Sequence, residues 1–281
     1  MNTSANDLKI IANKIRYYAL EGIYNAQSGH PGGSMSMAEI MSVLFFNELR
    51  IDPENPKKPD RDRFVLSKGH AAPGYYAALA LRGFFPVGEL KNLRKIDSPL
   101  QGHPDMKKVN GVDMSTGSLG QGISSAVGMA LYGKTNRKDY RVYTLTGDGE
   151  IEEGQVWEAA MAAGHYKLSN LTVFVDNNNL QIDGKVSEVM SVYPIAEKFR
   201  AFGFYTQEIN GNDIEEILRA LENCRMQSER PNAVICKTVK GKGISFMENQ
   251  QKWHGAAPNE ELYVKASAEL EAAITGLGGA L

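Results

Sequence analysis

Two neighbouring segments decide the fold: YRVYTLTGDGE at residues 140–150 and LTVFVDNNN at residues 171–179. The first segment predicts a buried strand over 140–145 and a tight turn at Gly147-Asp148-Gly149. The second predicts another buried strand over 171–176. With a helix between them, these strands are typical of a parallel sheet, whose ligands bind outside the carboxyl ends of the strands.

Asp148 and Asn178 directly follow these two strands, so we expect both at the same edge of the sheet. Glycines on both sides of Asp148 let the backbone approach a ligand closely, and the amides of the turn can donate to phosphate oxygens. The carboxylate oxygen of Asp148 and the amide oxygen of Asn178 can join two phosphate oxygens, a main-chain carbonyl and a water. Together they make the octahedron of about six oxygens that Mg²⁺ prefers. Calcium could substitute in a looser site. The two segments therefore predict a metal that holds a diphosphate.

Each of these pieces also has an ordinary structural interpretation. A GDG sequence is a common turn, and an asparagine run after a strand is usually a loop; the shared strand–turn–helix–strand context favours the metal site. The sequence patterns of other phosphate-binding loops fit this chain less well. The sequence has no GxxxxGK[ST], and GSLGQG at 117–122 lacks the GxGxxG spacing.

The rest of the chain alternates helices and strands, which predicts a single α/β domain over residues 1–281 with three α/β/α layers and a mainly parallel sheet. Further strands are expected at 64–66, 204–209 and 232–237. Helices are expected at 7–27, 36–49 with Ser36 as the cap, from about 73, and at 119–134, 153–167, 193–202, 213–226 and 259–274. The glycine-rich helix at 119–134 suits close packing against another helix or another subunit. Residues 275–281 are expected to form a flexible tail.

Composition favours an enzyme with small-molecule or protein partners. The 281 residues carry a net charge of −2 with Lys and Arg scattered among acids, so no nucleic-acid surface is predicted. Cys224 and Cys236 form no CxxC motif, which indicates core thiols in a reducing cytoplasm. The sequence shows no export signal and no run of about eighteen apolar residues, so neither secretion nor membrane insertion is expected.

Four of the five histidines stand beside glycine in loop-like segments: His30 in SGHPGG, His70 in SKGH, His103 in QGHP and His254 in KWHG. His165, inside a predicted helix, is expected to be structural. An isolated loop histidine is usually solvated, but four in such settings predict a cluster that donates to hydroxyls and phosphates and moves protons near neutral pH. A zinc site made of histidines is the competing interpretation, although no HxH or HExxH spacing supports it.

These motifs together resemble a known family. The run GDGEIEEGQVWEAAMAAGHYKLSNLTVFVDNNNLQIDG at 147–184, with SGHPGG, LSKGHAAPGYYAAL, GHP, STGSLGQG, KTVKGKG and WHG, is similar to the N-terminal domain of transketolase. The similarity is ordered along nearly the whole chain. It implies the thiamine diphosphate-binding fold, thiamine diphosphate and magnesium as cofactors, and transfer of a two-carbon ketol unit from a ketose phosphate to an aldose phosphate.

The resemblance also implies the residues that hold the cofactor. The metal ligands would be Asp148, Asn178 and the main-chain carbonyl of Leu180. The residues touching the cofactor would be His70, Gly117, Ser118, Leu119, Gly149, Asn178, Lys240 and His254, with 117–119 lining the aminopyrimidine. Gly33 stands where some relatives carry serine, so that hydroxyl contact is expected to be absent here.

The remaining implied roles concern the substrate and its protons. His30 and His103 would bind hydroxyls of the donor sugar. His70 and His254 would reach the reacting carbon as well as the diphosphate. Glu153 would belong to a proton network that links paired active sites.

Full transketolases continue into a pyrimidine-binding domain, which supplies the activating glutamate, and a C-terminal domain. After His254 this sequence has only a helix and a glycine-rich end, so we expect a split enzyme in which a separate C-terminal subunit carries those parts in an α2β2 complex. A piece of a longer enzyme is the alternative. Two other interpretations are the thiamine-binding subunit of a 2-oxo acid dehydrogenase or related synthase, and a regulatory protein that has lost catalysis. The histidines disfavour the first, and the intact metal and histidine residues disfavour the second.

Overall fold

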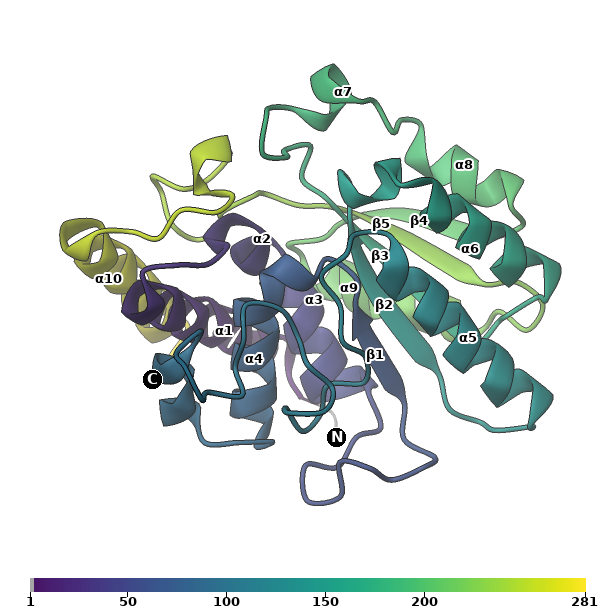
Figure 1. Cartoon of the computed structure of the whole chain (residues 1–281), viewed down its shortest axis with the longest axis horizontal. Coiled ribbons are helices and arrows are strands. Elements are labelled where there is room, and N and C mark those ends of the chain that lie inside the picture. Colours follow the sequence, from purple (N-terminus) through teal and green to yellow (C-terminus); the bar gives the residue numbers. More distant parts are fainter. Residues whose placement is uncertain (1–2) are drawn as a thin grey trace.

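The computed structural model describes residues 3–281 and is built around a five-stranded sheet (Figure 1). The strands are β1 (Arg63–Leu66), β2 (Val142–Gly147), β3 (Leu171–Asn177), β4 (Tyr205–Asn210) and β5 (Asn232–Lys237). Their order is β1-β2-β3-β5-β4 and every pairing is parallel, which confirms the predicted parallel sheet. β2 begins and ends two residues later than predicted, so the first glycine of the GDG turn belongs to the strand.

Helices cover both faces of the sheet and complete the three predicted layers (Figure 1). One face carries α5 (Gln121–Thr135), α6 (Gly154–His165) and α8 (Ile195–Ala201). The other carries α1 (Ala5–Ala26), α3 (Ala38–Val43), α4 (Ala72–Arg82) and α9 (Ile214–Arg225). The short helices are α2 (Pro31–Ser36) and α7 (Val186–Val189), with single 3-10 turns at Gly69–Ala71, Val87–Asn92, Glu150–Glu152 and Gln251–Trp253.

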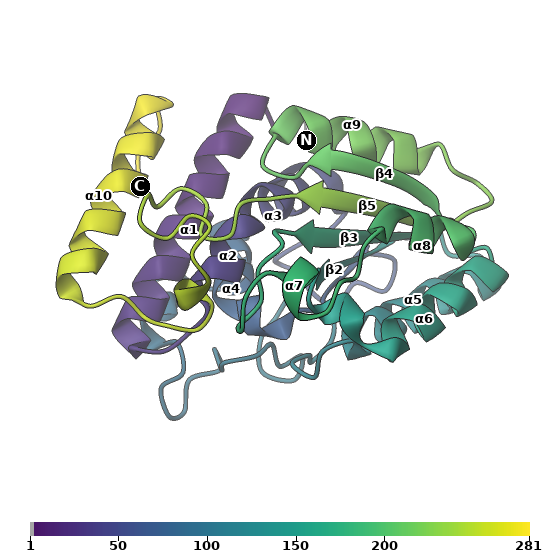
Figure 2. The same cartoon turned by 90° about the horizontal axis from the view of Figure 1, so that it is seen from above.

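The last helix, α10 (Glu260–Gly276), lies along α1, as Figure 2 shows. The rings of Tyr24 and Tyr263 stack between them at 3.9 Å. α10 includes the first two residues of the expected flexible tail, because the helix ends at Gly276 and not at 274.

Each face of the sheet has its own apolar core because side chains alternate along a strand. Phe64 and Leu66 of β1 belong to one core, whereas Val65 between them belongs to the other. Both faces are therefore dry, which explains why the strands are apolar at nearly every position. Cys224 and Cys236 are buried and unbridged, as expected for core thiols.

The predicted helix over 36–49 is wrong in its start and in its continuity. It is replaced by α2, α3 and a π-helical turn at Leu44–Glu48. α2 begins at Pro31, because a proline at the first helical position forfeits no intrahelical hydrogen bond. Ser36 ends α2 instead of capping a helix, and its hydroxyl donates to Asp176 at 2.6 Å. The end of α2 is thereby tied to the carboxyl end of β3.

The glycines of α5 allow close packing, as predicted, but two of them, Gly122 and Gly133, approach the sheet and its flanking residues instead of another helix or subunit. An ideal Cβ on Gly122 would lie 2.6 Å from the Cα of Ser67, just after β1. One on Gly133 would lie 2.9 Å from the ring of Tyr140. α5 therefore approaches the sheet more closely than a helix with larger side chains could.

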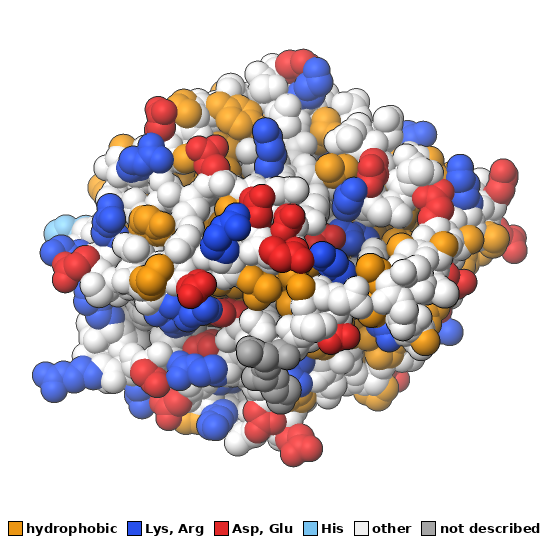
Figure 3. All heavy atoms as spheres, turned by 180° about the vertical axis from the view of Figure 1, so that it is seen from behind, with side chains coloured by type: hydrophobic (Ala, Val, Ile, Leu, Met, Phe, Trp, Pro, Cys, Tyr) orange, Lys and Arg blue, Asp and Glu red, His pale blue; other side chains and the backbone are white. Residues whose placement is uncertain are grey.

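The described residues include no helix that could span a membrane, and the face shown in Figure 3 has no broad basic area. None of the described helices combines the length and the apolar character needed to cross a bilayer. On the face in Figure 3, Lys and Arg side chains are interspersed with Asp and Glu. That face therefore offers no continuous positive surface for a polyanion.

The contact between α6 and the segment before β4 generates the first prediction. An ideal Cβ on Gly164 would clash with the carbonyl oxygen of Phe202. We expect Gly164→Ala to lower the free energy of unfolding by about 1–3 kcal/mol, because the added methyl forces the two backbones apart. Gly128→Ala in α5 is the matched control: its Cβ meets nothing within 4 Å, so helix propensity should raise stability by about 0.5–1 kcal/mol. Urea unfolding followed by circular dichroism measures both, and equal shifts would contradict the contact.

Candidate functional site

A cavity of about 310 Å³ lies at the carboxyl ends of the strands. Its walls come from the loops after β1, β2, β3 and β5, the place where ligands of parallel sheets bind. The residues selected from the sequence that line it are His30, His70, Gly117, Leu119, Asp148, Gly149, Asn178, Leu180, Lys240 and His254. His103, Ser118 and Glu153 do not line it.

The parallel pairing of β2 and β3 brings Asp148 and Asn178 to the same edge, as the sequence predicts. The register aligns Gly147 with Asp176, so both selected residues follow immediately after the paired strand ends. The backbone N–H of Asp148 donates to the Asp176 carbonyl at 3.2 Å, which extends the ladder by one more residue. The relative position of the two side chains is therefore set by the strand register.

Asp148 is a buried carboxylate suited to binding a cation. It accepts hydrogen bonds from the backbone N–H groups of Gly149, at 2.9 Å, and Asn179. Burial, and then the negative charge of Asp176, raise the pKa of Asp148 to about 7 against the opposing effect of these two hydrogen bonds. A divalent cation beside this carboxylate would favour its ionised form and offset the cost of burying the charge.

Asn178 and Leu180 present uncharged oxygens beside Asp148. The amide of Asn178 is oriented at both ends: Nδ2 donates to Asp176 at 3.3 Å, and Oδ1 accepts from the N–H of Leu180 at 3.1 Å. The carbonyl of Leu180 accepts from Nζ of Lys240 at 2.7 Å. A carboxylate, an amide oxygen and a carbonyl form an oxygen-only donor set, which fits Mg²⁺ or Ca²⁺ better than zinc. Within residues 3–281, no three His, Cys, Asp or Glu side chains are grouped to hold a metal, so the histidine-only zinc alternative gains no support.

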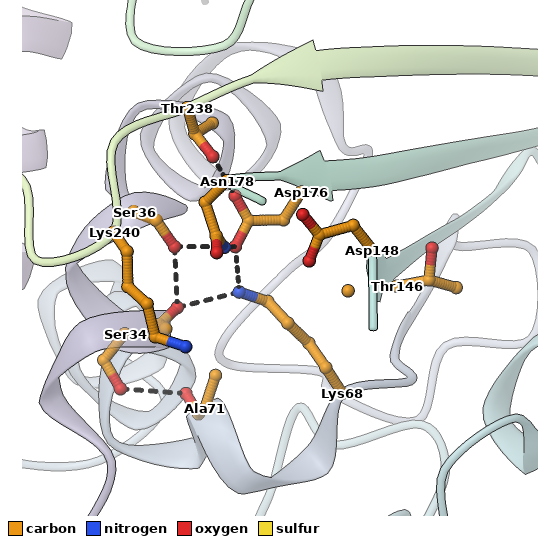
Figure 4. Close-up of polar contacts among 12 residues, drawn as sticks. Ser34, Ser36, Lys68, Ala71, Thr146, Asp148, Asp176, Asn178, Thr238 and Lys240 are labelled. Atoms are coloured by element: carbon orange, nitrogen blue, oxygen red, sulfur yellow. Dashed lines mark hydrogen bonds and ion pairs between the residues drawn. The ribbon is translucent and has the colours of Figure 1, made fainter. Parts of the chain in front are cut away.

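Asp176 is the centre of a buried network that sequence reasoning missed (Figure 4). Its carboxylate accepts hydrogen bonds from Lys68 at 2.5 Å, from Ser36 at 2.6 Å and from Thr238. Burial raises the pKa of Asp176, but the charge of Lys68 and these hydrogen bonds outweigh burial and hold it below its ordinary value. Asp176 is therefore an ionised group that orients Asn178. A charged residue at the end of a strand predicted to be buried is the signal that could have identified it.

Glu150 is a second buried acid that the sequence analysis did not select. Its carboxylate accepts from the hydroxyl of Ser67 at 2.5 Å and from the N–H groups of Gly120 and Gly147, each at 3.0 Å. Burial raises the pKa of Glu150 despite these hydrogen bonds. The contacts join the loop that carries 117–119 to the GDG turn, and thereby fix one wall of the cavity.

Three of the four loop histidines form the predicted cluster. The ring centroids of His70 lie 5.1 Å from those of both His30 and His254, and the last two are 5.5 Å apart. Burial is the main cause that lowers their pKa values, to about 4 for His30, to about 3 for His254 and well below the ordinary value for His70. All three imidazoles are therefore neutral at pH 7. Nδ1 of His30 is buried without a hydrogen-bond partner among the described residues.

His103 lies beside this cluster and not within it. Its ring packs against Gly117, on which an ideal Cβ would lie 2.9 Å from the ring, and it borders a separate surface hollow with Gln101 and Asp105. Burial and the charge of Arg94 lower its pKa. Since Gly117 lines the main cavity, only the width of that glycine separates His103 from it.

Ser118 and Glu153 are exposed and lie outside the cavity. Glu153 directly precedes α6, and its side chain lies over Gly120. The roles implied for these two residues stay predictions. His165, at the end of α6, is exposed and packs edge-on against Tyr166, so the structural role predicted for it stays a prediction.

The depressed histidine pKa values make stability depend on pH. An unfolded histidine has a pKa near 6.5, whereas His30 and His254 have values of about 4 and 3, so the unfolded chain binds more protons between these limits. Their contribution to stability is complete above pH 6.5 and is lost as the pH falls toward 4. We expect the double variant His30→Gln/His254→Gln to lose less stability than the parent between pH 7 and pH 5, measured by urea unfolding. His165→Gln controls for removing a histidine outside the cavity. An unaltered pH dependence in the double variant would contradict the neutral cluster.

Comparison with known proteins agrees with this geometry. The family described as "Transketolase, thiamine diphosphate binding domain" matches residues 8–270. A 6-deoxy-6-sulfo-D-fructose transketolase subunit SqwG from Clostridium sp. (strain MSTE9) is 45% identical over 96% of this chain and 98% of its own length. One of the subunits of an apulose-4-phosphate transketolase from Phocaeicola vulgatus is 40% identical over 96% of each protein.

Solved structures give the same result. The crystal structure of transketolase from Campylobacter jejuni superposes with a TM-score of 0.88 and 35% identity, covering 99% of this chain. The match covers 47% of that protein, so this chain spans about half the length of the solved transketolase. By sequence and by structure, the chain belongs to the transketolase family and corresponds to its thiamine diphosphate-binding domain.

Proposed function

We propose that this chain is the N-terminal subunit of a split transketolase that depends on thiamine diphosphate and magnesium. The observation that carries the proposal is the end-to-end alignment with relatives named as transketolase subunits, which covers 98% and 96% of their lengths. In this proposal the subunit transfers a two-carbon ketol unit from a ketose phosphate to an aldose phosphate, together with a separate C-terminal subunit.

The cavity supplies the groups that would hold the cofactor. Asp148, Asn178 and the Leu180 carbonyl are the proposed magnesium ligands, with Gly149 N–H and Asn178 also touching the diphosphate. When bound, thiamine diphosphate supplies the carbon nucleophile and the electron sink for breaking and forming the carbon–carbon bond. Further contacts to it are assigned to His70, Gly117, Ser118, Leu119, Lys240 and His254.

The histidines would bind substrate and move protons. A neutral imidazole has one N–H donor and one acceptor nitrogen, so it can hold a sugar hydroxyl. Acid–base groups contribute about 10²–10⁴-fold each to a rate when their pKa lies near the working pH, so proton transfer here requires an anionic ligand that raises the low pKa values of His30 and His254. We assign donor-hydroxyl binding to His30 and His103, and contacts near the reacting carbon to His70 and His254.

The partner would complete the site from outside. Leu119 and Ile182 line the cavity yet are 37% and 67% exposed, which suits a surface that another chain covers. We propose a C-terminal subunit that contributes the activating glutamate and most sugar-phosphate contacts, in an α2β2 complex. Glu153, exposed next to Gly120, is then available for the proton network between paired sites. The buried free thiols suit a reducing compartment, and we place the complex in the cytoplasm.

The first test of the proposal removes the proposed metal ligand. Asp148→Ala should abolish magnesium-dependent binding of thiamine diphosphate, because the metal loses its only anionic protein ligand. Asp183→Ala is the matched control, since Asp183 lines the same cavity but is exposed and is assigned no role. Calorimetry with the purified chain measures both, and normal cofactor binding by Asp148→Ala in magnesium would show that the site is wrongly placed.

The second test concerns the partner and the donor sugar. Purified alone, the chain should bind magnesium and cofactor weakly and transfer no ketol unit. With the C-terminal subunit found by co-purification, it should act on members of a panel of ketose donors and aldose acceptors. In that complex His103→Ala should spare cofactor binding and weaken use of the donor. Ketol transfer by the isolated chain that the partner fails to increase would refute the split enzyme.

A further inference from the structure

Lys68 is a buried cation on the cavity wall to which neither the motifs nor the proposed function assigns a role. It follows β1, is 2% exposed and lines the cavity beside Asp148. Its Nζ donates to the carbonyl of Gly33 at 2.8 Å and to Asp176 at 2.5 Å. An ammonium group has three N–H donors, so one is left over after these two contacts.

The surroundings of Nζ leave its cavity side open. An ideal Cβ on Gly33 would lie 3.7 Å from Nζ of Lys68 and 3.6 Å from Nε2 of His70. Glycine at this position therefore leaves space for a methyl-sized group between the ammonium and the imidazole. Figure 4 shows Lys68 and Lys240 reaching from different elements toward the same space, next to Asp148.

An anionic ligand in this space needs positively charged groups beside it. The buried charged residues on the cavity wall include three acids, Asp148, Glu150 and Asp176, and two lysines, Lys68 and Lys240. The lysines do not outnumber the acids, and a diphosphate carries more negative charge than a magnesium ion neutralises. A buried anion needs paired donors, so both ammonium groups are required near it.

We propose that Lys68 is a further anchoring residue for the cofactor and that its third N–H donates to a diphosphate oxygen. Asp176 then has two roles: its carboxylate positions the ammonium, and it orients the proposed metal ligand Asn178. This inference rests on the proposed function, because it takes the diphosphate to lie beside Asp148. The competing account is that Lys68 only neutralises Asp176 within the fold.

Four variants of the full chain separate the two accounts. Lys68→Met removes the cation, Asp176→Asn removes its carboxylate partner, and the double variant removes both charges, so it leaves no unpaired buried charge if Lys68→Met folds poorly. Lys242→Met is the matched control, because Lys242 belongs to the loop of Lys240 but pairs with Glu248 outside the cavity. Two probes are titrated by calorimetry: magnesium pyrophosphate, which reports diphosphate contacts alone, and thiamine diphosphate with magnesium. Circular dichroism checks the fold of each variant.

The accounts predict opposite patterns. If Lys68 binds the diphosphate, Lys68→Met and the double variant lose about tenfold to hundredfold affinity for both probes. Lys242→Met then keeps the parent affinity, because its ammonium lies outside the cavity, and Asp176→Asn loses part of the affinity, because the carboxylate that aims the ammonium is gone. If Lys68 only neutralises Asp176, the double variant regains the parent affinity, and that result would overturn the inference.

Failure of this inference is distinguishable from failure of the proposed function. A parent chain that binds neither probe, with or without magnesium, would contradict both. The other outcome is that the parent binds both probes, Asp148→Ala binds neither, and folded Lys68 variants bind like the parent. This outcome would contradict the role of Lys68 and leave the proposed function standing.

Discussion

The parallel pairing of β2 with β3 is the constraint on which the site depends. Its register sets Gly147 opposite Asp176, so the residues that follow each strand emerge at the same edge and height. A shift of one residue would turn the side chains of a whole strand to the opposite face. Because both faces of this sheet are buried, such a shift would also disrupt two apolar cores. The stability of the sheet and the geometry of the proposed metal ligands therefore have the same physical origin.

Burial gives the floor of the cavity its electrostatic character. Asp148, Glu150 and Asp176 are all buried, but their surroundings treat their charges differently. Asp176 has a lysine and several hydroxyl and amide donors, so its pKa is lowered. The pKa of Asp148 stays raised, because burial and the charge of Asp176 outweigh two backbone donors and the charge of Lys240. One carboxylate is thus satisfied by the protein and the other is suited to a metal. The neighbouring histidines are held neutral by the same burial, which makes them hydrogen-bonding groups for a ligand.

The relatives show how widely this arrangement is used. Subunits named for 6-deoxy-6-sulfo-D-fructose and for apulose-4-phosphate align with nearly the whole chain. The match to the longer Campylobacter jejuni enzyme is confined to 47% of that protein. The shared architecture is the cofactor half of the site, and the named sugars differ between relatives.

The sequence by itself determined the βαβ pattern, the bounds of β5, the pairing of Asp148 with Asn178 and the gathering of His30, His70 and His254. These features depend on local hydrophobic runs and on the rule that parallel strands end at one edge of a sheet. Short segments of sequence are therefore enough to predict them. Only the tertiary structure decided that Ser36 ends a helix and contacts Asp176, and that Lys68 is buried at the cavity. It also decided that His103 packs against Gly117, outside the cluster of the other three loop histidines. Those facts depend on contacts between residues 14 to 140 positions apart. Long-range burial and hydrogen bonding, which local propensity does not encode, decide which polar side chains face a ligand and which only support the fold.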